Sequence, residues 1–261
     1  MPYLERIWVY PVKALDPLHV LSAAFTQRGA LAQDREFAFV DADGRFINGK
    51  RVEAIHAIRS GFDLESRTLT LAKNDSPKVS SFSLLKQAQD AEAWMSNYLG
   101  YAVRLLRNED LGFPDDSEAW GPTVISTATL ETVASWFPGL SLESVRRRFR
   151  ANLEIGGVEA FWEERLYSEK GKVVTFHIGA VTLHGVNPCQ RCIVPTRDPD
   201  CAERYPDFQK IFQEKRRASL PAWANAGRFD HFYRLAINTR VNPDQHGRKI
   251  RLGDQVRLEN P

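Results

Sequence analysis

The chain has 261 residues, of which 43% are hydrophobic and 26% are charged. These fractions exclude a disordered or collagen-like chain, and the length allows one large domain or two closely packed ones. The formal net charge of +2 is too small to predict binding of a nucleic-acid polymer. The longest block of like charge, Arg146-Arg147-Arg148 with Arg150 beyond it, is more typical of a local anion site.

The three cysteines, Cys189, Cys192 and Cys201, lie within thirteen positions of one another. A small odd number indicates a reducing compartment rather than a disulfide framework. The first residues lack the charged and then apolar run of a signal peptide. No segment approaches the roughly 20 apolar residues that cross a bilayer. We therefore expect a cytoplasmic protein of a bacterium-like cell, with no membrane among its partners.

The first part of the chain predicts short strands and then one helix. The predicted strands cover residues 4–10, 36–40, 45–47, 61–64 and 68–71. Asp43-Gly44 between two of these runs is typical of a hairpin turn. Apolar residues at helical spacing predict a helix over 84–99, with Ser83 and Gly100 as its caps. A further strand is expected over 103–106.

The remainder continues this mixture of short strands and helices. Residues 112–117 are polar and irregular. The predicted strands cover 123–126, 148–155, two segments of 173–183 that meet at Gly179, 232–237 and 256–258. Helices are predicted over 128–137, where Pro138-Gly139 stops the helix, and over 206–216, with Pro206 in the first turn. The expected class is mainly β with peripheral helices (α+β), as a barrel or sandwich.

The segment from Asn187 to Pro199 contains a C-x-x-C pair, Cys189 and Cys192. A thioredoxin-like redox pair needs a helix to begin at the motif, and two prolines interrupt any helix downstream. A structural zinc site needs four ligands, which Cys201 and His184 could complete on paper. Two inert, buried cysteines fit the spacing equally well. Spacing alone leaves these alternatives open.

Arg191 lies between the two cysteines. A guanidinium in that position favours the thiolate form of a neighbouring cysteine, and thiolate is the form that binds a metal. The guanidinium also presents forked donors that suit a phosphate. The local chemistry therefore indicates a ligand that is both anionic and metal-bearing.

The segment Asn187-Pro-Cys-Gln-Arg-Cys192, followed by Asp198-Pro199, resembles the cysteine motif of MOSC-domain proteins. Val9-Tyr-Pro-Val-Lys13 resembles the opening of the β-barrel domain that precedes MOSC in the branch of the amidoxime reducing components and related bacterial reductases. Three further segments match in the same order: Asp34-Arg35, Arg148-Phe-Arg-Ala-Asn152 and Gly253-Asp254. The resemblance spans nearly the whole chain. It implies an N-terminal β-barrel-like domain over 1–110 and a MOSC β-barrel over 111–261.

The resemblance also implies a role for each matching residue. Cys192 would be the catalytic residue and the protein ligand of molybdenum in a molybdenum cofactor (Mo-molybdopterin). The cofactor-binding residues would be Lys13, Arg35, Gly121, Pro122, Arg150, Asn152, Gln190, Arg191 and Cys192 itself. The plain alternative is that Lys13 and Arg35 are surface charges, and that some of the arginines over 147–150 face solvent in a strand. Cys189 is expected to be half-buried and not to bind the metal.

Two positions depart from the family pattern. Ala14 stands where relatives often have serine, which removes one hydroxyl contact to the cofactor. Asp200-Cys201-Ala202 stands where many relatives have x-Thr-Gly, so the loop after the cysteine motif is expected to differ in shape and to affect substrate specificity.

The resemblance implies a molybdenum-dependent reductase of N-hydroxylated small molecules, namely amidoximes, hydroxylamines and N-hydroxylated bases. Some bacterial relatives carry a [2Fe–2S] ferredoxin domain, which needs four cysteines, whereas this chain has three. The expected electron donor is therefore a separate protein: a ferredoxin, a b5-type cytochrome or a flavin reductase. One alternative is a non-catalytic carrier of the cofactor, or a sulfurase-like MOSC protein. Another is a structural protein built on zinc or thiols.

Overall fold

The computed structural model describes residues 1–116 and 118–259. Ser117, at the end of the irregular segment predicted over 112–117, lies outside the described residues, as do Asn260 and Pro261. The described residues form mostly strands, with four α-helices beside them, which confirms the predicted α+β class. None of these helices has the length and apolarity that crossing a bilayer requires.

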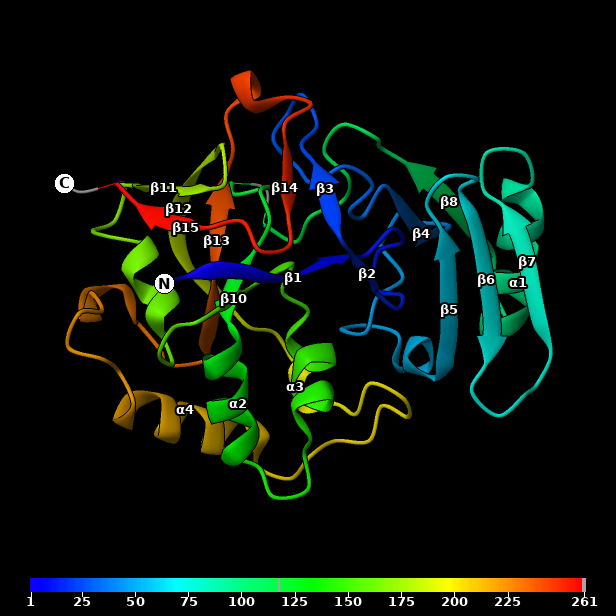
Figure 1. Ribbon diagram of the computed structural model, residues 1–261. Coiled ribbons are helices and arrows are strands. Elements are labelled where there is room, and N and C mark those ends of the chain that lie inside the picture. The colour runs from blue at the N-terminus through cyan, green and yellow to red at the C-terminus, as the bar shows by residue number, and fades with distance from the viewer. Residues whose placement is uncertain (117, 260–261) are drawn as a thin grey trace.

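An eight-stranded, mostly antiparallel sheet forms the left and centre of Figure 1. In spatial order its strands are β15 (Val256–Leu258), β11 (Val174–Ile178), β12 (Val181–Gln190), β13 (Arg234–Arg240), β9 (Val124–Ser126), β10 (Leu153–Gly156), β1 (Tyr3–Val9) and β2 (Leu18–Val20). The sheet is not closed by a full ladder. Only a bridge from Tyr3 to Gln255 and neighbouring backbone hydrogen bonds, such as Leu4 N to Asp254 O at 2.8 Å, join β1 to the start of β15.

Alternation along these strands places one apolar face inside the curved sheet. Leu4 and Ile7 of β1, Phe176 of β11 and Leu183 of β12 are completely buried in one core. Gly179, with φ of +57°, makes the tight turn between β11 and β12 that the sequence predicts.

The N-terminal part forms smaller sheets on the right of Figure 1. The strands there are β4 (Phe37–Asp41) paired with β8 (Val103–Arg107), and β5 (Ile58–Asp63), β6 (Thr68–Lys73) and β7 (Val79–Ser83) in a meander. Helix α1 (Ala88–Leu99) buries Met95 against the core of this part and ends at Gly100, whose φ is +79°. A third small sheet joins β3 (Ser22–Ala24) to β14 (Lys249–Arg251).

Two predictions for this part were wrong in detail. The turn at Asp43-Gly44 forms, and Phe46 bridges Val40, with a hydrogen bond from Ile47 N to Phe39 O at 2.8 Å, but residues 45–47 do not form a full strand; β8 pairs along the other edge of β4. The helix predicted from residue 84 begins at Ala88, because residues 84–87 form a turn between β7 and the helix. Its N-cap, Gln87, makes no capping bond, and Ser83 does not cap it.

The strand predicted over 148–155 was also wrong. Residues Leu142–Phe149 form helix α3, and only Leu153–Gly156 form a strand. The Ser141 hydroxyl accepts a hydrogen bond from Ser144 N at 3.1 Å and so caps the helix. Val145 and Phe149, four residues apart, are buried on one helix face. Arg148 is only 3% exposed, so the expectation of a solvent-facing charge fails there.

Helices α2 (Thr127–Ser135), α3 and α4 (Phe208–Ala218) lie together below the large sheet in Figure 1. They share an aromatic core in which Phe137 and Phe208 stack with ring centroids 4.2 Å apart. The predicted helix over 206–216 begins at Phe208, so Pro206 precedes it. Short 3-10 helices complete the described chain: η1 (Glu53–Ala57), η2 (Trp162–Leu166), η3 (Val194–Thr196), η4 (Ala226–Arg228) and η5 (Pro243–Gln245).

The first 24 residues pair with strands from much later in the chain: β1 with β10, and β3 with β14. The segment after β1 then leads directly into the smaller sheets. This crossing of the chain brings residues 13–59 and 147–199 to the same cavity. The predicted division between residues 110 and 111 stays a prediction.

Candidate functional site

A cavity of about 840 Å³ lies where the two parts of the chain meet. Its walls come from segments that are far apart in sequence, within residues 13–17, 30–35, 48–59, 111–123, 147–152, 187–199 and 227–238. Twelve lysines and arginines line it, against five aspartates. The cavity is therefore an environment that favours an anion.

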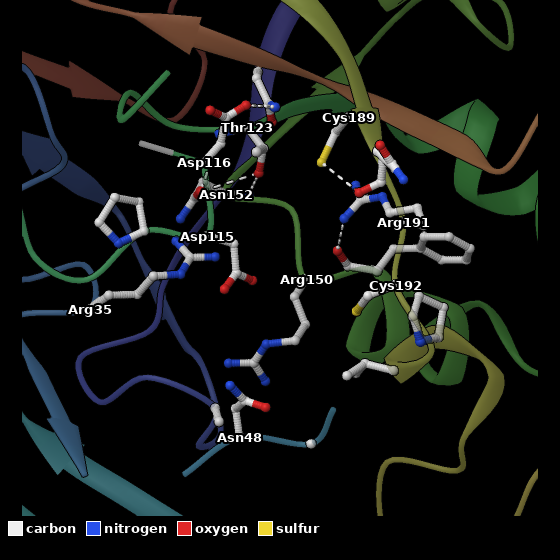
Figure 2. A pocket seen from close by; sticks show the side chains of 18 of the residues that line it. Arg35, Asn48, Asp115, Asp116, Thr123, Arg150, Asn152, Cys189, Arg191 and Cys192 are labelled. Carbon is white, nitrogen blue, oxygen red and sulfur yellow. Dashed lines mark hydrogen bonds between the residues drawn. The ribbon is translucent and has the colours of Figure 1, made fainter. Parts of the chain in front are cut away.

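Cys192 lies in this cavity just after β12, where the chain leaves the large sheet. The last register pair of β12 is Gln190 with Arg234 of β13, and Arg191 N then donates to Tyr233 O at 3.0 Å. Figure 2 shows the sulfurs of Cys189 and Cys192 on the same wall. Both thiols are free and half-buried. A short 3-10 helix, η3, follows the pair instead of an α-helix, which differs from the arrangement of a thioredoxin-like motif.

The Arg191 guanidinium is fixed beside this wall by two backbone carbonyls. Nε donates to Leu235 O and Nη1 donates to Phe149 O, both at 2.9 Å. The remaining nitrogen, Nη2, is buried, and no described residue accepts its hydrogen bonds. Leaving a buried donor unpaired is unfavourable. An anionic group in the cavity would satisfy it.

Arg150 projects into the middle of the cavity in Figure 2. It ends α3 with φ of +53°, and its Nη2 donates to Leu15 O at 2.7 Å. Among the described residues no carboxylate lies within 4 Å of it. Burial lowers the pKa of this guanidinium from its ordinary value, because water is no longer there to stabilise the charge. Arg150 is thus a half-buried cation for which no described residue supplies a counter-ion.

Tyr10 supports the cationic side chains of this site and is not among the residues predicted from the sequence. Its ring lies 4.2 Å from the Arg150 guanidinium carbon and 5.2 Å from that of Arg35. The hydroxyl donates to Ala151 O at 3.2 Å, and burial raises the pKa of Tyr10 to about 12. A buried neutral ring held in this way orients two guanidinium groups. The Val-Tyr-Pro-Val-Lys segment was the signal that could have pointed to Tyr10.

Lys13 is buried and Arg35 is half-buried, and each lies beside a carboxylate. Lys13 is 6% exposed, and its Nζ donates to Phe113 O at 2.8 Å and to Asp115 at 2.7 Å. Arg35 is paired with Asp34. Burial alone would raise the pKa of Asp115, but Lys13, Lys50 and Arg35 together hold it well below its usual range. The charges of Lys13 and Arg35 are therefore partly neutralised from within the chain, unlike that of Arg150. Nothing in the sequence pattern singled out Asp115.

Asn152 is 1% exposed and ties three segments together. Its Oδ1 accepts from Thr123 N at 3.1 Å and from Thr123 Oγ1 at 3.2 Å, while Nδ2 donates to Trp8 O at 3.1 Å. One amide hydrogen is left for a ligand. Asn152 lines the cavity, and its hydrogen bonds hold β1 and the start of β9 around it.

The remaining predicted contacts divide between the cavity wall and the surrounding core. Gly121 and the exposed Gln190 line the cavity. A side chain at Gly121 would meet Thr239, since an ideal Cβ there lies 2.6 Å from its Oγ1, so the close approach requires glycine. Pro122 is buried outside the lining, and its carbonyl accepts from Thr239 Oγ1 at 2.6 Å.

Cys201 and His184, the other candidate metal ligands, each contact one polar side chain. The Cys201 thiol is exposed and lies 3.4 Å from Asp198 Oδ1, and His184 Nδ1 lies 3.2 Å from Thr175 Oγ1. Within residues 1–116 and 118–259 there is no group of three or more His, Cys, Asp and Glu side chains placed to hold a metal ion. A metal that is carried by an organic ligand needs fewer protein donors.

The sequence matches two family models in register with this geometry. The MOSC N-terminal beta barrel domain matches residues 1–102, and the MOSC domain matches residues 123–257. The chain belongs to the MOSC family. Its relatives include mitochondrial amidoxime-reducing component 1 of Homo sapiens, 25% identical over 76% of this chain and 66% of that protein. The component 2 proteins of Macaca fascicularis and Rattus norvegicus are 23% and 24% identical over 76% of this chain and 67% of theirs. The chain thus spans about two thirds of the length of these relatives.

The two positions that depart from the MOSC pattern share an unusual backbone conformation. Ala14 and Ala202 both adopt positive φ, +71° and +65°, a region that costs an alanine about 1–2 kcal/mol relative to glycine. The loop around Ala202 is held by Asp200, whose Oδ1 lies 2.7 Å from both Arg59 Nη1 and Arg147 Nη2. Arg59 comes from β5 and Arg147 from α3. Asp200 therefore joins the loop after the cysteine motif to both parts of this MOSC protein.

The residues that gather around the cavity fit an anionic, metal-bearing ligand. The cavity is faced by a free thiol, by two guanidinium groups that no described carboxylate neutralises, and by a buried donor that no described residue satisfies. Thiolate binds a soft metal, and guanidinium binds phosphate.

Proposed function

We propose that this MOSC protein is a molybdenum-cofactor-dependent reductase of N-hydroxylated compounds. The observation that carries the proposal is the pair of arginines, Arg150 and Arg191, that share one cavity with the free thiol of Cys192. Neither has a carboxylate within 4 Å among the described residues, and Arg191 keeps a buried donor unpaired. Buried charges are normally compensated, so a bound anion is the expected partner.

Each residue of the cavity has a role in this proposal. The Cys192 sulfur would be the protein ligand of molybdenum, and Arg150 and Arg191 would hold the anionic pterin and its phosphate by charge-assisted hydrogen bonds. Lys13 and Arg35 would bind the phosphate in addition to their carboxylate partners. Backbone groups at Gly121 and the side chain of Gln190 would contact the pterin. Pro122 and Asn152 would act by positioning the walls.

When bound, the cofactor supplies the two-electron chemistry that converts an N–OH group to N–H and releases water. The cavity, at about 840 Å³, is large enough to hold both a cofactor and a small substrate. We propose that the electrons come from a separate redox protein (a ferredoxin, a b5-type cytochrome or a flavin reductase) and that the protein works in the cytoplasm. The names of the amidoxime-reducing relatives support the reaction class.

Turnover separates a reductase from a carrier that only holds the cofactor. Protein from a molybdenum-replete host is expected to reduce benzamidoxime to benzamidine with a dithionite-reduced viologen as electron donor. A protein that carries molybdenum and pterin but reduces neither benzamidoxime nor 6-hydroxylaminopurine would be a carrier, and the reductase proposal would fail.

Arg150→Met is expected to weaken retention of the pterin about 10- to 100-fold, because a charge-assisted bond to phosphate contributes about 1.5–3 kcal/mol. The measurement is the pterin content of the purified variant after dialysis, by fluorescence of the oxidised pterin. Arg104→Met, at an exposed position of β8, is the matched control and should retain pterin like the parent. Equal retention in all three proteins would remove Arg150 from the cofactor site.

A further inference from the structure

Arg197 is another cation that lines the cavity, and it has no part in the proposed cofactor site. It follows Cys192 by five residues, after the short helix η3, and its backbone N donates to Val194 O at 3.0 Å. Its side chain is almost completely buried, at 4% exposure. Burying a guanidinium costs free energy unless an anion or a hydrogen-bond acceptor binds it.

The charge of Arg197 is only weakly compensated. Glu53 Oε1 lies 2.5 Å from its Nη1, but the Glu53 side chain is 59% exposed and is shared with Arg204 at 3.5 Å. Ion pairs with such an exposed carboxylate are screened by water. Nε and Nη1 of Arg197 are both buried and make no hydrogen bond of good geometry to a described residue. The guanidinium therefore keeps donors for a ligand.

Asn48, in the N-terminal part, lines the same cavity. Asn48 Oδ1 accepts from Lys50 N at 3.0 Å, which leaves its amide N–H groups without a described acceptor. In Figure 2, Asn48 and the Arg150 guanidinium point toward the same part of the cavity. An ideal Cβ on Gly49 would lie 2.5 Å from His56 Nε2 and 3.3 Å from Val194 Cγ2, so this segment touches the loop that follows Cys192.

His56 also lines this cavity, and the charge of its imidazole depends on its surroundings. Burial lowers its pKa, and Arg197, Arg150 and Arg59 lower it further. The imidazole is therefore neutral at pH 7, and the cavity gains no positive charge from it. The other nearby carboxylates, Asp16 and Asp200, are engaged by Arg59 and Arg147. Arg197 is then left with the exposed Glu53 carboxylate as its ion-pair partner.

We propose that Arg197, with the Asn48 amide as a second donor, binds an anionic group of the substrate, a carboxylate or a phosphate monoester. The substrates would then be N-hydroxylated compounds that carry a negative charge on the side away from the reacting N–OH. This inference rests on the proposed reductase function, because it places the substrate in the same cavity as Cys192. Arg197 is a specificity-determining residue in this proposal and takes no part in the chemistry.

The test uses substrates that differ in one charge. The parent protein, loaded with cofactor, is expected to reduce 4-carboxybenzamidoxime with a kcat/KM at least about tenfold above that for benzamidoxime, mainly through KM. Arg197→Gln should lower that preference about 10- to 100-fold. Arg204→Gln, which removes the exposed arginine on the same Glu53 carboxylate, should leave the preference as it is in the parent. N6-hydroxyadenosine and its 5′-monophosphate, compared in the same way, distinguish a phosphate from a carboxylate as the preferred group.

A binding measurement keeps the inference separate from the proposed function. Calorimetric titration with 4-carboxybenzamidine and with benzamidine, in the parent and in Arg197→Gln, needs no turnover. Turnover without any preference for the charged substrate overturns the inference and leaves the reductase proposal intact. Absence of turnover overturns the reductase proposal, and the titration then decides the inference: binding of the carboxylated compound that depends on Arg197 supports it, and equal binding in both proteins overturns it.

Discussion

Replacing Cys192 with serine is expected to lower reduction of benzamidoxime by at least about a hundredfold while the fold and most of the bound pterin are retained. Loss of a second-sphere group of a metal site already costs about 10- to 100-fold, and loss of the ligand itself should exceed that. A hydroxyl is a poorer donor than thiolate to a soft metal. The pterin would stay because Arg150 and Arg191 bind its anionic end independently of the sulfur. The measurements are steady-state kinetics and pterin fluorescence on the same preparation.

The other two cysteines provide matched controls. Cys189→Ser alters the same wall of the cavity, where the thiol lies 3.7 Å from Gln190 O, and should keep activity within a few-fold of the parent. Cys201→Ser alters an exposed thiol and should leave activity unchanged. Full activity in Cys192→Ser, or loss of activity in Cys189→Ser alone, would show that Cys192 is not the ligand.

Replacing Arg146 with methionine is expected to lower the free energy of unfolding by about 3–5 kcal/mol, the cost of leaving one partner of a buried ion pair uncompensated. Arg146 binds Glu154 through two bonds, Nε to Oε1 at 2.6 Å and Nη2 to Oε2 at 2.9 Å. Glu154 is 1% exposed, and Trp8 Nε1 would be its nearest remaining donor, at 2.7 Å. The pair joins α3 to β10, with Arg146 before Arg150 in the chain and Glu154 after it. Urea unfolding followed by tryptophan fluorescence measures the loss.

A double substitution separates the charge from the packing. Arg146→Met combined with Glu154→Met removes both charges and should recover most of the lost stability, because the desolvation cost of each ion disappears with it. Arg147→Met, one residue along the same helix, alters a partly exposed pair with Asp200 and should cost about 1 kcal/mol or less. A loss as large in the double variant as in Arg146→Met would assign the effect to packing.

Most of the strands could be predicted from the sequence because one face of each is buried. The alternation around Gly179 gives β11 and β12 with little ambiguity, and Gly100 ends α1 as expected. The segment around Arg148 failed for a physical reason. Phe149, Ala151 and Leu153 alternate as in a strand, whereas the α3 helix depends on the Ser141 cap and on arginines that are buried through tertiary contacts. Local periodicity does not contain those contacts.

The residues of the candidate site also fall into those that the sequence predicts and those that it does not. Motif order identified Cys192, Lys13, Arg35 and Arg150, and the fold brings all four to one cavity. Tyr10 lies within a matched motif, but its contact with Arg150 could not be predicted from it. Asp115 and Arg197 could not be assigned, because their significance comes from neighbours more than 100 residues away, such as Lys13 beside Asp115. Pro122 and Asn152 matched the motif, but their observed contacts are with the surrounding chain.

The most direct test of the central claim is the molybdenum and pterin content of the protein purified from a molybdenum-replete host, measured by elemental analysis and pterin fluorescence. The account predicts molybdenum and pterin in equal amounts, approaching one of each per chain, with Cys192 as the ligand. Protein that contains zinc, or that contains neither molybdenum nor pterin under these conditions, would contradict it.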